Sequence, residues 1–322
     1  MNTFIVGGTG FIGYHSALEF LKRGHSVSTL SLPDITIGQW FPREITINYG
    51  NIFEMTEKQL IELFAGQDAM VYAIGPDDRY TPPRPAYKFF HEMLVEKCGY
   101  IITAAQKAGV KRCVVLNSYF AYFDRMFPEY NLAEHHPYIE CRIEQSDRVI
   151  SIGGSGMDVM VLELPYIFGT MPGRTPMWKD VFQKMRIDRK FVFYPKGGSN
   201  MISVEHVAQA VAGAIENGTH AKCYTIGDAN LTWIEMLDIV FEAMDTEKKK
   251  VITITCFLAS IYGIFHKMRD RREGKESGLD YHYLFKDFLC RNFFFDPTES
   301  AKELGYDRGG IEKSIDKTIK AF

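Results

Sequence analysis

Short runs of apolar residues alternate with amphipathic stretches along the first half of the chain. The apolar runs are TFIVGG, HSVSTLS, ITINYGN, AMVYAIG and KRCVVLNS. They are continuous rather than alternating, which is typical of strands buried on both faces of a sheet. The stretches between them, such as GYHSALEFLKRG and TEKQLIELFAGQ, have helical periodicity, and the second carries a Thr/Glu start signal and ends at Gly66. Repeated strand–helix–strand units predict an α/β fold with a doubly wound parallel sheet and helices on both faces.

The pattern changes after the sixth apolar run, MDVMVLELPYIFG. A segment with two prolines interrupts the regularity, and helical patterns dominate beyond it. A helix and a strand at about 200–228 return to the first pattern. Because 322 residues exceed the usual size of one core, we predict two interleaved domains. We expect one domain at residues 1–165, with the return segment, and a smaller, mainly helical lobe at residues 166–322, the first to bind a cofactor and the second to shape a substrate pocket.

Composition narrows the function classes. A formal net charge of -3 gives no electrostatic reason to expect nucleic acid as a partner. Six cysteines are spread without a CxxC pair, which argues against disulfides and structural zinc, and we find no metal-ligand spacing. The N-terminal residues do not resemble a secretory signal, so we expect a cytoplasmic protein. The longest apolar stretch, VITITCFLASIYGIF at 251–265, is too short to cross a bilayer comfortably. We interpret it as a strand and a buried helix, and docking of this stretch on a membrane surface is the less favoured alternative.

Three glycines carry the most specific chemical signal. Gly7, Gly10 and Gly13 directly follow a predicted strand and open a helix, with Phe11 and Ile12 between the last two. In this setting the first glycine allows a tight turn, the second lets a pyrophosphate approach the backbone, and the third permits close helix–strand packing. The helix N-terminus adds free N–H groups and a positive dipole end. The sequence therefore predicts a Rossmann-type dinucleotide site.

The choice of dinucleotide depends on the end of the second strand. An acidic residue there would hold the adenosine ribose of NAD, but Ser31 stands at this position and Asp34 comes only after a proline. We expect NAD or NADP, with NADP slightly favoured because the repelling acid is missing. After the third strand, Asn51 either presents its amide to the adenine edge or belongs to a turn, and Ile52 lies beside it.

The segment HPYIECRIEQ places Tyr138 and Arg142 four residues apart. On a helix the two side chains lie on one face, one turn from each other. A phenol beside a fixed cation can act as a proton donor or acceptor near neutral pH. Spacing alone also allows a coincidence, so the rest of the chain has to decide.

The chain resembles the extended branch of the short-chain dehydrogenase/reductase superfamily, which includes epimerases and dehydratases. The likeness covers nearly the whole chain through GGTGFIG, AAQKAGVKRCVVLNSYFAYF, LELPYIFG, ISVEHVAQAV and AKELGYDRGGIEKSI. It implies that Ser118 and Tyr138 are catalytic and that Arg142 replaces the family's lysine. Tyr138 would then exchange a proton with a carbonyl or alcohol while Ser118 hydrogen-bonds the same oxygen. Arg142 would favour the phenolate through its charge. The family's lysine also holds the nicotinamide ribose, and with arginine this contact is either rebuilt or lost.

Several further residues have two interpretations. Glu96 either pairs with Arg142 or is an exposed helix residue. The loop histidines His135 and His136 are solvated, or His136 lines the pocket. Arg174 contacts a substrate phosphate or lies on the surface. The aromatic stretch at 281–295 is core, part of which could form an apolar pocket.

We therefore expect an NAD(P)-dependent oxidoreductase acting on a small-molecule carbonyl or alcohol. The alternatives are a nucleotide-sugar epimerase or dehydratase with retained NAD, and a non-catalytic dinucleotide-binding regulator. The family resemblance also suggests a homodimer.

Overall fold

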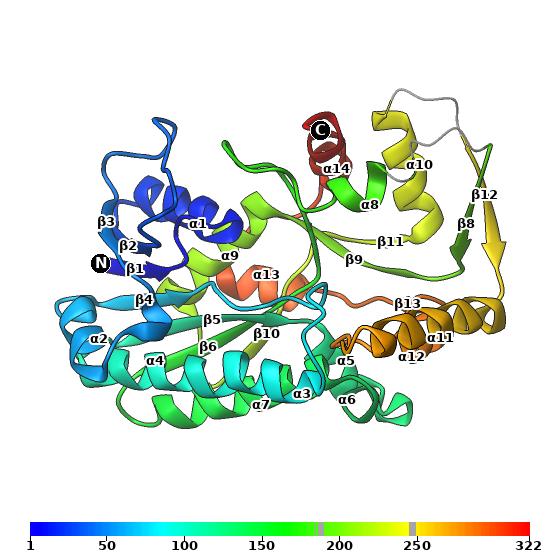
Figure 1. Cartoon of the computed structure of the whole chain (residues 1–322). Coiled ribbons are helices and arrows are strands. Elements are labelled where there is room, and N and C mark those ends of the chain that lie inside the picture. Colours follow the sequence, from blue (N-terminus) through cyan, green and yellow to red (C-terminus); the bar gives the residue numbers. More distant parts are fainter. Residues whose placement is uncertain (184, 186–189, 245–248) are drawn as a thin grey trace.

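The computed structural model describes residues 1–183, 185, 190–244 and 249–322, and its centre is a seven-stranded parallel sheet (Figure 1). The strand order is β10-β6-β5-β4-β1-β2-β3. The strands are β1 (Asn2–Val6), β2 (Ser26–Ser31), β3 (Thr46–Tyr49), β4 (Ala69–Tyr72), β5 (Arg112–Ser118), β6 (Asp158–Leu164) and β10 (Cys223–Thr225). Each apolar run of the first half supplies one of them, so the predicted parallel α/β sheet is confirmed.

Helices cover both faces of this sheet (Figure 1). One face packs against α1 (Phe11–Lys22) and α9 (Val204–Asn217), and the other against α2 (Glu57–Phe64), α4 (Lys97–Lys107) and α7 (Pro137–Gly153). Neighbouring residues of β1 alternate between the two cores, since Ile5 packs on the first face and Phe4 on the second. Burial on both faces explains why the strands are continuous apolar runs.

The predicted start of α2 is confirmed in detail. Thr56 caps this helix and forms a reciprocal capping box with Gln59, while Gly66 follows the helix with φ of +75°. The return segment also behaves as its pattern indicates. Ser203 caps α9 by accepting the His206 N–H at 3.2 Å, and β10 pairs with β6 at the edge of the large sheet.

The remaining elements form a second group around two small sheets. One sheet contains β7 (Tyr166–Phe168), β9 (Gly198–Ser203), β11 (Ala229–Thr232) and β13 (Asn292–Phe293), and the other contains β8 (Phe191–Pro195) and β12 (Lys250–Ile254). Helices predominate here as expected, but the sequence pattern did not reveal these sheets. The helices of this group are α8 (Lys179–Gln183), α10 (Trp233–Ala243), α11 (Cys256–Arg272), α12 (Tyr281–Tyr283), η4 (Leu284–Phe288) and α14 (Ile311–Lys320). The helix α13 (Thr298–Leu304) packs with α9 in the core of the large sheet instead.

Short helices connect β3 to β4 and fill the region from β4 to α7. They are η1 (Ile52–Glu54), α3 (Ala86–Phe90), the π-helical turn η2 (His91–Glu96), α5 (Phe120–Met126), η3 (Pro128–Tyr130) and α6 (Leu132–His135). Aromatic rings of α5 and of the 281–295 stretch pack together, with Phe288 and Phe293 stacked at 4.3 Å. The expectation that this stretch contributes to the core is correct.

The expectation of a buried helix within 251–265 is wrong. The strand exists as β12, but α11 exposes Phe257 by 72% and Phe265 by 66% and buries the small residues Ala259, Ser260 and Gly263. Helical periodicity tells which residues share a face, and it does not tell which face is buried. No helix in the described ranges is long and apolar enough to cross a membrane.

Candidate active site

The loop between β1 and α1 turns tightly against its own helix. Gly7 has φ of +93°, and a Cβ atom on it would lie 2.5 Å from Ile74 Cγ2. A Cβ on Gly13 would lie 2.1 Å from the Gly7 carbonyl oxygen. Gly10 differs, because its Cβ would meet only that same oxygen, at 3.0 Å. Gly7 and Gly13 are therefore required by the packing, whereas Gly10 leaves its outer side open to a ligand.

The N-terminus of α1 adds donors to this opening. Gly10 is its cap residue, no side chain in the described ranges caps the helix, and the first turn has no acidic residue. The first N–H groups of a helix lack intrahelical partners and lie at the positive end of its dipole. Phe11 and Ile12 in this first turn are half-buried. An open glycine cradle with uncapped donors fits the pyrophosphate of a dinucleotide.

Thr29 on β2 holds the loop in this shape, and sequence reasoning missed it. Its buried hydroxyl donates to the Ile5 carbonyl oxygen at 2.7 Å and accepts the Gly8 N–H at 3.0 Å. The only signal in the sequence was a hydroxyl residue inside an otherwise apolar strand.

The predicted adenosine side is less open. Ser31 is buried at the end of β2, where its hydroxyl donates to the Leu32 carbonyl oxygen at 3.3 Å. Asn51 caps η1, since its amide accepts the Phe53 N–H at 3.2 Å and donates to Glu54 Oε1 at 2.8 Å. Its turn interpretation therefore holds in this structure. Ile52 is buried in the core beneath.

The three predicted catalytic residues converge at the carboxyl end of β5. Ser118 is the last residue of this strand, and Tyr138 and Arg142 lie on the first turns of α7, all three buried. Asn117 ties the two elements together, because its side-chain amide donates to the Arg142 carbonyl oxygen at 2.9 Å and to Ser146 Oγ at 3.0 Å. Its Oδ1 accepts the Ser118 N–H at 2.5 Å. Asn117 was not identified from the sequence.

Arg142 is held by protein oxygens on three sides. Its guanidinium donates to the carbonyl oxygens of Leu116 at 3.3 Å and Pro76 at 3.4 Å, and to Gln145 Oε1 at 2.8 Å. The same group lies over the Tyr138 ring, 5.0 Å from its centre. Nε is buried and has no hydrogen-bond partner within the described part of the chain. Arg142 therefore lies beside the phenol as a fixed cation, and its Nε–H remains an unused hydrogen-bond donor.

The Tyr138 phenol has its pKa raised to about 12. Burial is the main cause, and the nearby carboxylates of Asp78 and Asp77 add to it. The Arg142 charge lowers the pKa, as expected, but does not outweigh burial. Tyr138 therefore keeps its proton at neutral pH and can act as a proton donor, while Arg142 favours the phenolate formed afterwards.

Asp78 is a further acidic group at this site that the sequence reasoning did not select. It is half-buried on the loop after β4, and burial together with Asp77 raises its pKa to about 6. Burial raises the pKa of Tyr119 and Tyr166, and the charge of Asp78 adds to this rise. The Tyr119 hydroxyl lies 2.9 Å from Ser199 Oγ. The signal in the sequence was a pair of aspartates at the carboxyl end of a buried parallel strand, where ligands bind in such sheets.

Other candidates lie elsewhere. Glu96 is exposed and lies 3.7 Å from His91, so it does not pair with Arg142. Arg174 is exposed on the surface. His136 is buried rather than solvated, and its Nδ1 accepts the Asp280 N–H at 2.9 Å. Burial lowers the pKa of His136 to about 4. His135 stacks on Tyr283 at 3.6 Å.

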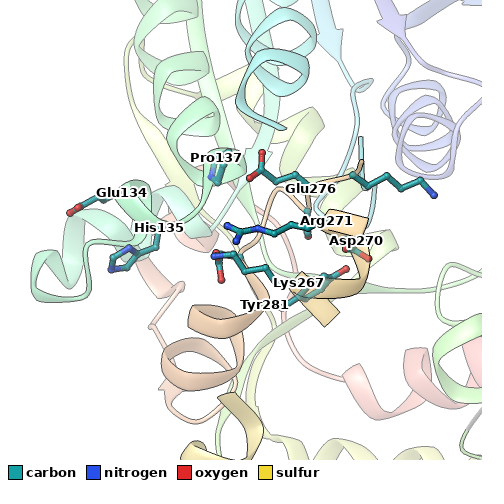
Figure 2. A pocket seen from close by; sticks show the side chains of 11 residues that line it. Glu134, His135, Pro137, Lys267, Asp270, Arg271, Glu276 and Tyr281 are labelled. Carbon is teal, nitrogen blue, oxygen red and sulfur yellow. The ribbon is translucent and has the colours of Figure 1, made fainter. Parts of the chain in front are cut away.

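A cavity of about 140 Å³ opens beside the start of α7 (Figure 2). Ser277 and Asp280, which line this cavity, flank Gly278. The Gly278 carbonyl oxygen accepts the N–H of Tyr138 at 2.9 Å. None of Ser118, Tyr138 and Arg142 lines it. Its lining is strongly charged and comprises Glu134, His135, Pro137, Lys267, Asp270, Arg271, Lys275, Glu276, Ser277, Asp280 and Tyr281.

The glycine loop and the sheet match those of a known protein family. A family described as NAD(P)H-binding matches residues 7–218, which contain the glycine loop and most of the sheet. The chain belongs to this NAD(P)H-binding family. A curated relative, the uncharacterized protein y4nL of Sinorhizobium fredii, is 23% identical over 240 residues. That match covers 68% of this chain and 66% of the relative. The family supports a nicotinamide dinucleotide as cofactor.

Solved structures share the fold of this family member along its whole length. The crystal structure of gox2253 has a TM-score of 0.79 at 17% identity and covers 99% of this chain and 97% of its own. Bordetella bronchiseptica WbmH with NAD⁺ has a TM-score of 0.70 at 16% identity, covering 100% and 98%. UDP-glucose 4-epimerase of Thermotoga maritima has a TM-score of 0.70 at 14% identity, also covering 100% and 98%. At these identities the likeness shows the fold, which is the one implied by the resemblance to extended short-chain dehydrogenases/reductases.

Proposed function

We propose that the protein is an NAD(P)H-dependent oxidoreductase that reduces a carbonyl group on a small molecule. The observation that carries this proposal is the buried Tyr138 phenol with the Arg142 guanidinium 5.0 Å from its ring centre. The raised pKa of Tyr138 keeps the phenol protonated at neutral pH, which suits a proton donor. The glycine loop lies at the carboxyl edge of the same parallel sheet, where ligands of such sheets bind.

In this reaction the residues of the chain would each have a distinct role. When bound, a reduced nicotinamide supplies a hydride to the carbonyl carbon. Tyr138 donates its proton to the carbonyl oxygen, and the Ser118 hydroxyl hydrogen-bonds that oxygen as charge develops. Arg142 stabilises the phenolate left on Tyr138. Gly10 and the first N–H groups of α1 hold the pyrophosphate, and Ser31 lies where the adenosine ribose is expected. Residues 166–322, apart from the return segment, would shape the substrate pocket.

A deuterium-transfer assay tests this proposal. Purified protein is incubated with NADPH or NADH carrying deuterium at C4 of the nicotinamide and with a panel of aldehydes and ketones. We expect one or more alcohol products with deuterium on the former carbonyl carbon. If no carbonyl compound oxidises a dinucleotide that demonstrably binds, the oxidoreductase proposal is wrong.

A nucleotide-sugar epimerase or dehydratase is a second candidate, and one observation favours it. Enzymes that share the fold over the whole chain include a UDP-glucose 4-epimerase and a dTDP-glucose 4,6-dehydratase. In such a reaction the hydride returns within one turnover, so the dinucleotide stays bound. Mass spectrometry of the supernatant after denaturation distinguishes the two candidates. Stoichiometric retained NAD favours the epimerase or dehydratase, and its absence with binding on titration favours the oxidoreductase.

A further inference from the structure

The solvent-facing side of α11 carries a continuous row of large apolar residues. Phe257, Ile261, Ile264, Phe265 and Met268 follow one another at spacings of three, four and one, which puts them on one face of the helix. We call these five residues the α11 stripe. Phe257 and Phe265 are highly exposed, Ile264 and Met268 are exposed, and Ile261 is half-buried. A contiguous exposed apolar face of this kind is typical of an interaction surface.

The orientation of α11 is determined by its other face. Ala259, Ser260 and Gly263 are buried, and a Cβ on Gly263 would lie only 2.3 Å from the Tyr281 carbonyl oxygen. Only a side without large side chains can approach the neighbouring backbone this closely. Turning the stripe inward would bring phenylalanines into that contact, so the helix cannot bury them against its own chain.

The helix ends in a cluster of cations beside the stripe. Its last six residues contain Lys267, Arg269, Arg271 and Arg272 with Asp270 as the single acid. Lys267 pairs with Asp280, and Arg269 approaches Asp270 at 3.4 Å. Arg271 and Arg272 make no ion pair within the part of the chain that the structure describes, and Arg271 extends beside Lys267 at the rim of the charged cavity (Figure 2).

The apolar surface continues onto the strands that precede α11. β12 leads into the helix through its cap residue Thr255 and pairs with β8, where Phe191 and Phe193 are exposed on alternate positions. Figure 1 places β8, β12 and α11 at the same edge of the molecule. The start of α11 and the strand β8, with their exposed phenylalanines, therefore lie at one end of the protein, remote from β3. The arginines lie at the inner end of the helix, where the Arg84 N–H donates to the Gly274 carbonyl oxygen at 3.1 Å.

We propose that the α11 stripe and its adjoining arginines bind the surface of an anionic lipid bilayer, with the helix lying in the interface plane. Phenylalanine, isoleucine and methionine side chains would enter the acyl boundary, and Arg271 and Arg272 would meet the negative headgroups. A second copy of the chain fits less well. A two-fold contact through the α11 stripe, which contains no acidic residue, would leave Arg271 and Arg272 of both copies without an anionic partner, whereas an anionic bilayer supplies one. The surface lies outside the proposed catalytic residues. The proposal takes up the less favoured interpretation of residues 251–265, in which they dock on a membrane surface.

Vesicle flotation of the full-length protein tests the proposal. The vesicles are phosphatidylcholine alone, or phosphatidylcholine with about one third phosphatidylglycerol, at low and high salt. We expect wild-type protein to float with the anionic vesicles and to lose binding at high salt. Phe257→Ser with Phe265→Ser should lower partitioning by about 100-fold or more, because two buried aromatic side chains are lost. Arg271→Ser with Arg272→Ser should lower partitioning by about 10-fold or more on anionic vesicles only.

A matched control replaces exposed apolar residues on other parts of the surface. Tyr49→Ser with Met126→Ser removes side chains that are 58% and 53% exposed, and it should float as the wild type does. All variants must keep wild-type dinucleotide binding, which reports that they fold. The proposal is overturned if wild-type protein fails to float with anionic vesicles, or if the phenylalanine variant floats as well as wild type. It is also overturned if light scattering shows a dimer that the phenylalanine variant dissociates while vesicles bind neither protein.

Discussion

Arg142 lies in an unusual position for a buried cation. It has hydrogen bonds to three protein oxygens and a phenol ring beneath it, but no carboxylate within ion-pair distance in the described residues. A charge without a counter-ion is costly to bury, so replacing it with an apolar side chain of similar length need not cost stability. Its retention is better explained by its effect on Tyr138, whose pKa it lowers against the effect of burial.

Loss of the Arg142 charge should therefore change activity much more than stability. Arg142→Met should reduce kcat by about 100-fold or more, because the phenolate formed during proton donation loses its cation. The free energy of unfolding should change by only about 1 kcal/mol in either direction. Arg142→Lys, which keeps the charge, is the matched control and should recover part of kcat. Steady-state kinetics and urea unfolding of the three proteins measure both quantities. Equal losses of activity in the methionine and lysine variants would contradict a role for the charge.

Asp78 gives the site a pH dependence. Its pKa of about 6 lies above the ordinary aspartate value, so the folded protein binds this proton more tightly than the unfolded chain does. Stability from this group is therefore fully present below the unfolded pKa and decreases as pH rises toward 6. Asp78→Asn should raise the free energy of unfolding at pH 7.5 by up to about 3 kcal/mol, and by little near pH 4. Urea unfolding at the two pH values checks this, and a gain that is equal at both would contradict it.

The same carboxylate should affect catalysis. Ionised Asp78 raises the pKa of Tyr138 and so weakens it as a proton donor. Carbonyl reduction should therefore slow as pH rises through about 6, and Asp78→Asn should remove this step from the kcat profile. Asp77→Asn is the comparison variant: Asp78 can still ionise, so the step should persist but move to lower pH, because Asp77 helps to raise the pKa of Asp78. A step that persists unchanged in Asp78→Asn would assign it to another group.

At the residue scale, local patterns and the family resemblance selected Ser118, Tyr138 and Arg142 as candidates, and the structure places them near the carboxyl end of β5. Thr29, Asp78 and Asn117 could not be identified in this way. Their roles depend on partners 24 residues away, on burial, and on a tie between β5 and α7 that spans 25 residues. A single sequence gives the type of these side chains but not what they face.

At the element scale, the glycine loop makes two distinct demands on its glycines. A Cβ on Gly13 would collide with the backbone of Gly7, whereas a Cβ on Gly10 would meet the protein only at 3.0 Å and otherwise project into the opening for the ligand. Gly10→Ala should therefore raise the Kd for NAD(P)H by about 100-fold with a stability loss of roughly 1 kcal/mol or less. Gly13→Ala should destabilise the protein by more than that, because backbone must move. Titration calorimetry and thermal unfolding measure the two effects.

The result that would contradict this assignment is specific. If Gly10→Ala bound dinucleotide as tightly as wild type, its outer side would not be the pyrophosphate site.

The elements themselves were well predicted where burial on two faces leaves continuous apolar runs, as in β1 and β5. Short strands of the second group, such as β13, and the outward face of α11 were not, because long-range packing decides them.

At the scale of the whole molecule, the parallel sheet, the glycine loop at its edge and the family match agree on a nicotinamide dinucleotide. The domain boundaries, the preference for NADP and the homodimer remain predictions.

The preference for NADP depends on Ser31, which stands where an acid would hold the ribose of NAD. Ser31→Asp should weaken NADPH binding by about 10-fold or more relative to NADH, through repulsion of the 2′-phosphate. Fluorescence titration with both cofactors measures the ratio, and an unchanged ratio would contradict the placement of Ser31 at the ribose.

The most direct test of the account compares Tyr138→Phe with wild-type protein on a carbonyl substrate found in the deuterium-transfer assay. The variant removes one hydroxyl from a buried ring and leaves the glycine loop untouched. The account predicts unchanged NAD(P)H affinity and a kcat lowered by about 1,000-fold, since the proton donor is gone. Turnover that survives in Tyr138→Phe with normal cofactor binding would show that Tyr138 does not donate the proton.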